Sequence, residues 1–350
     1  MSLQLQDIRS LTLPELQEVV AAMGQPSYRA KQIFHWLQAV GVTSFEEMTD
    51  QSKAFRAALA QRYYIANAGI AQRLISKLDG TRKYLFQLHD GECVESVLMD
   101  YHHGRSNCIS TQVGCKMGCT FCATGRSGFS RNLTAGEMLA QVQTAQRDGG
   151  KRVSNIVLMG MGEPLDNYEN VLRFLDLVSA PDGMQIGMRH ISLSTCGLVD
   201  RIYDLAERGY QLTLSVSLHA PNDAIRRRTM SVARKYSMEE LLKACRHYAQ
   251  VTGRRISYEY AMIRGVNDTE ACARELARRL EGTLCHVNLI PVNSVSGTGY
   301  QKSPVEVQQR FIRILEQHGI AATVRRTLGS DINASCGQLR RRKLEEAPHV

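Results

Sequence analysis

The sequence predicts an α/β fold with a parallel sheet, and three observations support this prediction. After residue 104, short apolar runs rich in branched residues alternate with helix-like stretches in six consecutive units. A strand followed by a helix adds one parallel strand to a sheet whose helices lie outside it. The 350 residues suffice for roughly two domains, and 43% apolar with 22% charged residues is typical of a folded globular chain. The order of the units leaves a doubly wound sheet and a partial barrel both open.

The sequence pattern of residues 1–70 predicts that they form a helical accessory domain. Thr12 followed by Glu15 fits a capping box at the start of a helix, and apolar residues recur after it at helical spacing. The period changes to two in residues 71–103, where apolar residues alternate on both sides of a turn at Asp90–Gly91. This alternation predicts a β-hairpin.

Residues 104–330 contain the six units, and residues 331–350 form a tail beyond them. The predicted strands cover residues 108–113, 155–159, 190–194, 212–217, 256–262 and 287–292. The predicted helices cover residues 134–148, 168–178, 199–208, 238–250, 269–281 and 304–317. Distinctive polar residues follow several strands, at residues 115–122, 162–164, 194–195, 217–219 and 291–293. Because the carboxyl ends of parallel strands meet at one edge, we expect a functional site there.

Charge and cysteine usage narrow the class of protein. The 43 Lys and Arg residues exceed the 34 Asp and Glu residues, so the net charge is +9 and a polyanionic partner is favoured. No apolar run approaches the roughly 18 residues that span a bilayer, and the opening residues lack the layout of a signal peptide. We therefore expect a cytoplasmic protein, in which ten cysteines are more typical of metal ligands or reactive thiols than of disulfides.

Three of these cysteines form a compact motif. Cys115, Cys119 and Cys122 have the spacing CxxxCxxC, and thiolates suit zinc or iron–sulfur clusters. A structural zinc site needs four ligands, usually in pairs, and a [4Fe-4S] cluster normally takes four cysteines. Three cysteines leave one iron open to bind a small molecule, so the motif favours an open [4Fe-4S] cluster over zinc.

The motif resembles the signature of the radical S-adenosylmethionine (SAM) enzymes, in which it follows the first strand of a partial (β/α)6 barrel. The resemblance implies that the open iron binds SAM. One electron then breaks a carbon–sulfur bond of SAM and forms a 5′-deoxyadenosyl radical. The expected fold is therefore such a partial barrel, with an N-terminal helical domain and a connecting hairpin.

A closer resemblance rests on the motifs that begin at Gly114, Met159, Ser215, Ile290 and Ala334. They are similar to those of the bacterial family that methylates an adenine carbon in RNA. The resemblance implies methylation of C2 of an adenosine in 23S rRNA at the peptidyl transferase centre, and of the adenosine 3′ to the anticodon in certain tRNAs. A sister branch, the chloramphenicol-florfenicol resistance methyltransferases, modifies C8 of the same rRNA adenosine. The branches share these motifs, and we favour C2 as the housekeeping activity.

The resemblance also implies roles for three residues. Cys336 corresponds to the cysteine that one SAM methylates and a second SAM activates, so that two SAM molecules are used per turnover. Cys108 corresponds to the residue that resolves the covalent protein–RNA adduct and pairs transiently with Cys336 in a disulfide. Glu95 corresponds to a proton acceptor, although the sequence leaves open whether Glu95 or Cys108 takes the proton. Without the resemblance, Cys108 would be a core residue and Glu95 a solvated strand carboxylate.

The resemblance further implies the cofactor contacts and partners. The expected SAM contacts are Gly162, Glu163, Ser194, Ser217, Leu218, His219 and Asn293. Basic runs that could contact RNA are residues 226–228, 254–255, 325–326 and 340–343, although any single run is more often a solvated face. We expect a monomer that receives one electron at a time from a flavodoxin or ferredoxin.

Two other classes compete with this interpretation. A methylthiotransferase would carry a second three-cysteine cluster in an N-terminal domain, and residues 1–92 contain no cysteine. A non-enzymatic RNA-binding protein with a structural metal would share the basic charge and the cysteines, but would use no SAM.

Overall fold

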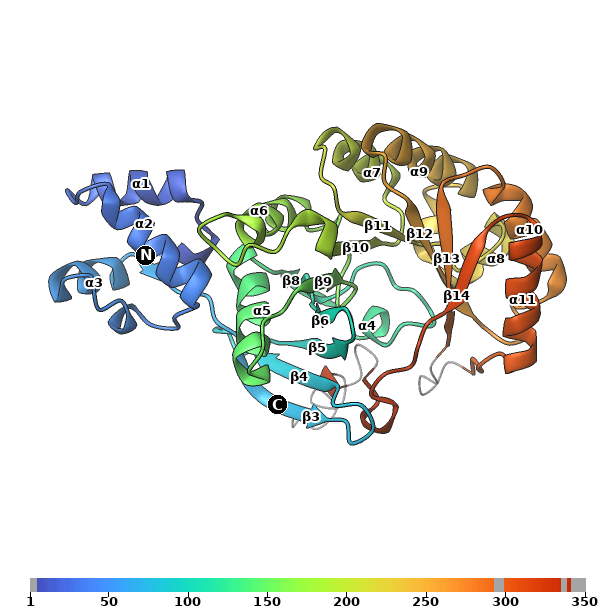
Figure 1. Cartoon of the computed structure of the whole chain (residues 1–350), viewed down its shortest axis with the longest axis horizontal. Coiled ribbons are helices and arrows are strands. Elements are labelled where there is room, and N and C mark those ends of the chain that lie inside the picture. Colours follow the sequence, from blue (N-terminus) through green and yellow to red (C-terminus); the bar gives the residue numbers. More distant parts are fainter. Residues whose placement is uncertain (1–4, 293–298, 335–338, 341–350) are drawn as a thin grey trace.

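The computed structural model describes residues 5–292, 299–334 and 339–340. Its main sheet has ten strands in the order β14-β13-β12-β11-β10-β9-β6-β5-β4-β3. The sheet is open within the described residues, with β14 and β3 at its edges, and helices cover it (Figure 1). The predicted α/β fold with a central parallel sheet is therefore confirmed, as an open partial barrel.

The N-terminal part of the chain is helical, as predicted. It contains α1 (Leu13–Ala22), α2 (Tyr28–His35) and α3 (Lys53–Ala60). The short strands β1 (Gln6–Asp7) and β2 (Tyr63–Tyr64) pair in parallel and bring the ends of this region together. The predicted capping box begins α1, because the Thr12 N–H donates to the Glu15 carboxylate at 2.7 Å and the Glu15 N–H donates to the Thr12 hydroxyl at 3.4 Å.

A buried carboxylate joins the helical region to the sheet. The Asp7 side chain accepts hydrogen bonds from the Ala66 N–H at 3.1 Å and the Thr134 hydroxyl at 2.9 Å. The Gly136 N–H donates to the Ser10 hydroxyl at 2.8 Å nearby. Thr134 and Gly136 lie at the start of α5 (Ala135–Gly149), so the N-terminal region is fixed against the helix that covers the first parallel strands.

The predicted hairpin is present and extends the main sheet. The strands β4 (Arg82–Gln87) and β5 (Cys93–Tyr101) are antiparallel, and Gly91 has the positive φ of +84° that this turn requires. The sequence prediction missed β3 (Gly69–Ile75), which pairs antiparallel with β4. Because β5 also pairs with β6 (Gly104–Cys108), these strands form an extension of the sheet, which we call the antiparallel extension (β3, β4 and β5).

Parallel strands follow in chain order from β6. They are β9 (Asn155–Leu158), β10 (Ile191–Thr195), β11 (Thr213–Ser217), β12 (Ile256–Met262), β13 (Cys285–Pro291) and β14 (Ala321–Val324). The short β14 was not predicted, because its four residues carry little sequence pattern.

The first parallel strand differs from its prediction. The expected strand 108–113 is instead the end of β6 followed by a separate strand, β7 (Gln112–Gly114), which pairs with β8 (Phe129–Asn132) outside the main sheet. The chain leaves the sheet at Ser110, whose hydroxyl donates to the Glu95 carbonyl at 2.6 Å and whose N–H donates to the Gln141 side chain at 2.9 Å. An apolar run alone does not reveal such side-chain contacts.

The predicted helices all form within two residues of their expected ends. They are α5, α6 (Tyr168–Ser179), α7 (Val199–Glu207), α9 (Met238–Thr252), α10 (Glu270–Leu280) and α11 (Val305–Gln317). The additional short helices are α4 (Ala123–Arg126) and α8 (Asp223–Thr229). Short turns of other helix types occur at Ile8–Ser10, Trp36–Val40, Phe45–Glu47, Met188–His190, Ser231–Arg234 and Ser330–Ile332. Across the described ranges, every helix is too short or too polar to cross a membrane.

We predict that Gly136→Ala destabilises the protein. The added Cβ would lie 2.2 Å from Oδ2 of Asp7, and the buried Asp7 cannot move without losing its hydrogen bonds, so the cost is about 1–3 kcal/mol. Thermal unfolding measures the effect. The control is Gly187→Ala, at an ordinary φ of −63° and with its nearest atom 3.9 Å away. Equal unfolding temperatures for the two variants would contradict the prediction.

Candidate active site

The three clustered cysteines lie on one tight loop between β7 and α4. The loop begins at Gly114, whose φ is +84° and where an added Cβ would lie 2.0 Å from the Gly128 carbonyl oxygen. The Cys115 N–H donates to the same carbonyl at 2.9 Å, and the Cys122 N–H donates to the Cys119 carbonyl at 3.1 Å. Glycine at position 114 is therefore required for the chain to turn back on itself before the first cysteine.

The thiols of this loop are partly exposed and influence one another. Burial raises the pKa of Cys115 to about 12 and also raises the pKa of Cys119, and repulsion from Cys122 adds to both shifts. Within the described ranges, no three or more His, Cys, Asp or Glu side chains are placed to hold a single metal ion. A cluster is bound differently, because each thiolate holds its own iron. Three soft donors on one short loop fit such a cluster.

Glu163 connects the ends of two neighbouring strands. Its buried carboxylate accepts hydrogen bonds from the Cys196 N–H at 2.7 Å, after β10, and from the Leu165 N–H at 3.0 Å, after β9. Burial raises the pKa of this carboxyl group. The preceding Gly162 has a φ of +105°, and an added Cβ there would lie 2.6 Å from Cβ of Gln112. The predicted pair Gly162–Glu163 therefore lies beside the chain that leads into the cysteine loop.

The predicted residues of the next two strands share this edge of the sheet. Ser194 is buried near the end of β10, and the half-buried Ser217 is the last residue of β11. Leu218 is fully buried, and its N–H donates to the Glu259 carbonyl at 3.0 Å. The structure thus brings Ser194, Ser217 and Leu218 to the same end of the sheet as Glu163.

His219 is held in a strained position beside the cysteine loop. Its φ is +55°, and its Nδ1 atom accepts a hydrogen bond from the Ala261 N–H at 2.9 Å. The ring packs edge-on against Phe121, with 4.9 Å between ring centroids. Burial lowers its pKa to about 3. The imidazole is therefore neutral with its proton on Nε2, where it can donate a hydrogen bond.

Two buried charged residues of the site were missed by the sequence analysis. Arg226 was grouped with the basic runs, but it is fully buried, and its Nη2 atom donates to the Cys196 carbonyl at 2.7 Å. Glu259 lies inside β12, where it accepts hydrogen bonds from the Asn288 amide at 2.8 Å and the Ser257 hydroxyl at 3.1 Å. A carboxylate within an apolar strand was the available signal for Glu259.

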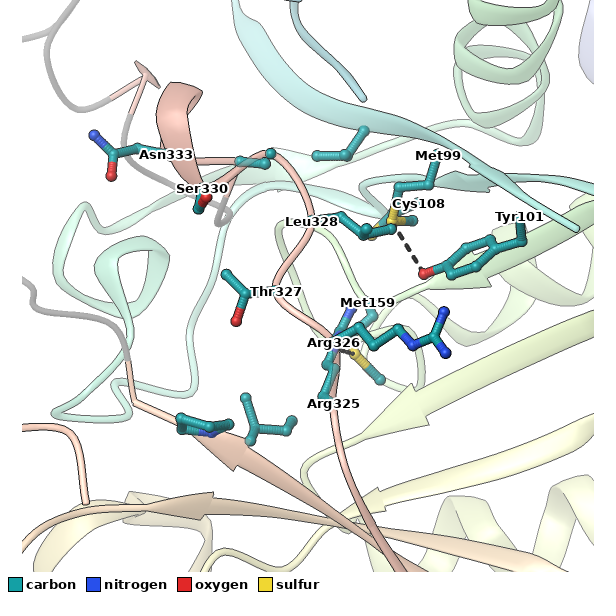
Figure 2. Close-up of a pocket in the computed structure, with 15 residues that line it drawn as sticks. Met99, Tyr101, Cys108, Met159, Arg325, Arg326, Thr327, Leu328, Ser330 and Asn333 are labelled. Atoms are coloured by element: carbon teal, nitrogen blue, oxygen red, sulfur yellow. Dashed lines mark hydrogen bonds between the residues drawn. The ribbon is translucent and has the colours of Figure 1, made fainter. Parts of the chain in front are cut away.

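A cavity of about 290 Å³ opens beside Cys108. Figure 2 shows Met99, Tyr101 and Cys108 on one side of it, and Met159 and Arg325 on another. The Arg325 guanidinium donates to the Met159 sulfur at 3.0 Å. The cavity is lined by β5, β6, the residue after β9, the end of β13 and the segment after β14, so segments distant in sequence meet there.

Glu95 is fully buried on β5 and is not a solvated strand carboxylate. Its Oε2 atom lies 3.2 Å from the Lys83 ammonium, which is also fully buried. Its Oε1 atom accepts a hydrogen bond from the Arg340 N–H at 2.8 Å. Lys83 was not singled out in the sequence, because a lysine in a strand is usually exposed.

The basic runs occupy different environments. Arg226 and Arg340 are both buried, so these two candidates are poorly placed to contact RNA. The Arg254 guanidinium donates to the Thr213 hydroxyl at 3.2 Å. Thr213 is the first residue of β11, so Arg254 lies at the amino ends of the parallel strands, whereas the cysteine loop lies at their carboxyl ends. Among these arginines, Arg325 and its neighbour Arg326 line the cavity.

Two predicted site residues, Asn293 and Cys336, lie outside the described residues. Because Cys336 is not described, the described part of the structure lends no support to the transient disulfide expected between Cys108 and Cys336.

The fold and the cysteine loop together define a class of enzyme. The radical SAM superfamily model matches residues 109–276. The crystal structure of a radical SAM methyltransferase from Sphaerobacter thermophilus is 47% identical to this chain, with a TM-score of 0.91 over 95% of this chain and 98% of that chain. The structure is therefore that of a radical SAM enzyme.

The N-terminal region defines the family within this class. A model described as the ribosomal RNA large subunit methyltransferase N-terminal domain matches residues 6–65. The probable dual-specificity RNA methyltransferase RlmN of Alkaliphilus oremlandii (strain OhILAs) is 54% identical, covering 97% of this chain and 98% of its own length. That of Clostridium perfringens (strain 13 / Type A) is 51% identical, covering 96% and 97%. The chain belongs to this family of radical SAM RNA methyltransferases.

We predict that His219 makes the protein sensitive to acid. Because its folded-state pKa of about 3 lies below the ordinary 6.5, the unfolded chain binds a proton that the folded chain does not. Stability therefore falls as the pH drops below about 6.5. His219→Asn keeps an acceptor for Ala261 and tolerates a positive φ, but does not titrate.

Urea unfolding of both proteins at pH 7 and pH 5, at equal cluster loading, measures this effect. The unsubstituted protein should lose about 2 kcal/mol more than the variant over this interval. Equal losses would show that the neutral His219 is not responsible.

Proposed function

We propose that this protein methylates C2 of an adenosine in 23S rRNA, and of the adenosine 3′ to the anticodon in certain tRNAs. One observation carries the proposal: Cys108 lines a cavity that Ala334, two residues before Cys336 in the sequence, also lines. Consecutive Cα atoms lie about 3.8 Å apart, so two residues span at most about 8 Å. This short separation along the chain supports a shared site for the two cysteines to which this chemistry assigns roles.

The cofactor residues have distinct tasks in this proposal. Cys115, Cys119 and Cys122 hold a [4Fe-4S] cluster, and the polar residues at the strand ends hold SAM. These residues are Gly162, Glu163, Ser194, Ser217, Leu218, His219 and Asn293. When bound, the cluster and SAM supply a 5′-deoxyadenosyl radical. The neutral His219 offers an Nε2–H donor without adding a positive charge beside the cationic SAM.

Adenine C2 explains why the chain uses a cysteine as methyl carrier. This carbon is electron-poor, so it does not attack the methyl group of SAM, but it accepts a carbon radical. Cys336 takes the methyl group from one SAM as a thioether and presents it to the base, and a second SAM is consumed to activate it. Either Glu95 or Cys108 accepts the proton that leaves the adduct. The Cys108 thiolate then attacks the Cys336 sulfur, which forms a transient disulfide and breaks the carbon–sulfur bond, so that the methylene group stays on the base and takes up a proton.

The charge and the cavity support the proposed RNA partners. The net charge of +9 favours a polyanion, and Arg325 and Arg326 lie at the cavity where a flipped-out base would enter. We propose that residues 1–70 form a second grip on RNA, beside the extension at 71–103, the partial barrel at 104–330 and the tail at 331–350. A flavodoxin or ferredoxin supplies electrons to this cytoplasmic monomer.

The decisive experiment is product analysis. Oxygen-free protein loaded with iron and sulfide should convert unmodified 23S rRNA and tRNA to products that release 2-methyladenosine on digestion, as measured by mass spectrometry. If 8-methyladenosine is the main product, the chain has the activity of the resistance branch. Purified protein that contains zinc and no sulfide, and cleaves no SAM, would instead support a non-enzymatic RNA-binding protein.

We predict that Cys336→Ala abolishes methyl transfer to RNA, because no thioether can form. Cluster absorbance and dithionite-dependent formation of 5′-deoxyadenosine should persist, since the variant keeps all three cluster cysteines. Cys285→Ala is the matched control, because this half-buried cysteine lies at the start of β13, away from the cavity. Full turnover by Cys336→Ala would remove the thioether step from the mechanism.

A further inference from the structure

The described part of the C-terminal tail lies against the antiparallel extension. The Gly329 N–H donates to the Asp79 carboxylate at 2.8 Å. The Asp331 carboxylate accepts hydrogen bonds from the Ser76 hydroxyl at 2.7 Å and the Lys77 N–H at 2.9 Å. These contacts place residues 329–331 beside the turn between β3 and β4 (Figure 1).

One buried ion pair fixes this tail at two points. The Lys83 ammonium donates to the Asn333 carbonyl at 2.9 Å and lies 3.2 Å from the Glu95 carboxylate. The same carboxylate accepts the Arg340 N–H at 2.8 Å. Asn333 precedes Cys336 by three positions and Arg340 follows it by four. The pair therefore holds the chain on both sides of the cysteine.

Stability alone does not account for a buried ion pair. Both side chains are fully buried, and the loss of hydration usually offsets the attraction between two such charges. An apolar pair of similar volume would be at least as stable, whereas charged groups impose defined hydrogen-bond geometry. This favours a positional role for the pair. Leu339 packs against Leu85 and Cys93 and supplies apolar contact beside it.

The pair also lies next to the cavity. Glu95 is two positions before Val97, which pairs with Cys108 across β5 and β6, and both Val97 and Cys108 line the cavity. The Glu95 backbone is fixed as well, because its carbonyl accepts the Ser110 hydroxyl at 2.6 Å. One rigid group of strands thus connects Cys108 to the anchor points of the tail.

We propose that Lys83 is a positioning residue for methyl transfer, which holds the Glu95 carboxylate and the Asn333 carbonyl and so fixes the described residues on both sides of Cys336 against the antiparallel extension. This inference rests on the proposed function for the role of Cys336. The anchoring itself depends only on the contacts of Lys83, Glu95, Asn333 and Arg340.

The test compares Lys83→Met with Lys77→Met, which makes the same change at an exposed side chain of the same extension. Lys83→Met should lower the yield of methylated RNA per 5′-deoxyadenosine at least about tenfold, while SAM cleavage stays within about twofold of the unsubstituted enzyme. Lys77→Met should leave this coupling ratio unchanged. A merely destabilised enzyme would lose both reactions together, so an unchanged ratio in Lys83→Met overturns the proposal.

Hydrogen exchange tests the anchoring independently of activity. Amides of residues 329–334 should exchange at least about tenfold faster in Lys83→Met, with those of β10 to β12 unchanged. If that variant does not fold, the double variant Lys83→Met, Glu95→Gln removes both charges and keeps an acceptor for the Arg340 N–H. It should show faster exchange at residues 329–334 but not at Leu339–Arg340.

The outcomes separate the two proposals. Unchanged exchange at residues 329–334 in the variants overturns the anchoring role of Lys83. An unsubstituted enzyme that methylates no RNA contradicts the proposed function. The exchange measurement at residues 329–334 still decides whether Lys83 anchors the tail, because it does not depend on methylation.

Discussion

Parallel pairing of consecutive strands is the constraint on which the site depends. Each strand from β9 to β13 hydrogen-bonds to the next one in the chain. A parallel neighbour can be reached only through a crossover, so every strand ends at the same edge before the chain returns through a helix. The segments after β9, β10 and β11 therefore meet, although long stretches of sequence separate them. The cysteine loop reaches this edge because the chain leaves the sheet after β6.

Buried polar groups then fix the strand ends relative to one another. Glu163 connects the ends of β9 and β10, and Arg226 bonds to the Cys196 carbonyl after β10 and, at 3.3 Å, to the Leu218 carbonyl after β11. Asn267 donates to the His219 and Ala261 carbonyls at 2.8 and 2.7 Å. Removing such groups from water is costly unless their hydrogen bonds are made. Hydrogen-bonded networks of this kind favour one geometry for the carboxyl ends of the strands, which a radical reaction needs to keep its reactive carbon near a single target.

The antiparallel extension applies the same principle beside the cavity that Cys108 lines. It brings Glu95 and Arg340 into contact across 245 positions of sequence. Closing so long a loop has an entropic cost that grows only slowly with its length, and the polar contacts that the described residues 329–334 and 340 make with Ser76–Glu95 offset it. The extension therefore anchors the described part of the tail beside the cavity as well as extending the sheet.

The sequence by itself determined the features that depend on local pattern. Helix ends, the capping box at Thr12, the hairpin turn and the cysteine loop are encoded by neighbouring residues, because periodicity, caps and turn glycines act over a few positions. Only the tertiary structure decided the end of the first parallel strand at Ser110, the burial of Arg226 and the pairing of Lys83 with Glu95. In the sequence, each of these charged residues looks solvated. Their roles arise from partners far along the chain, and a charge becomes a structural anchor only when folding removes water and supplies those partners.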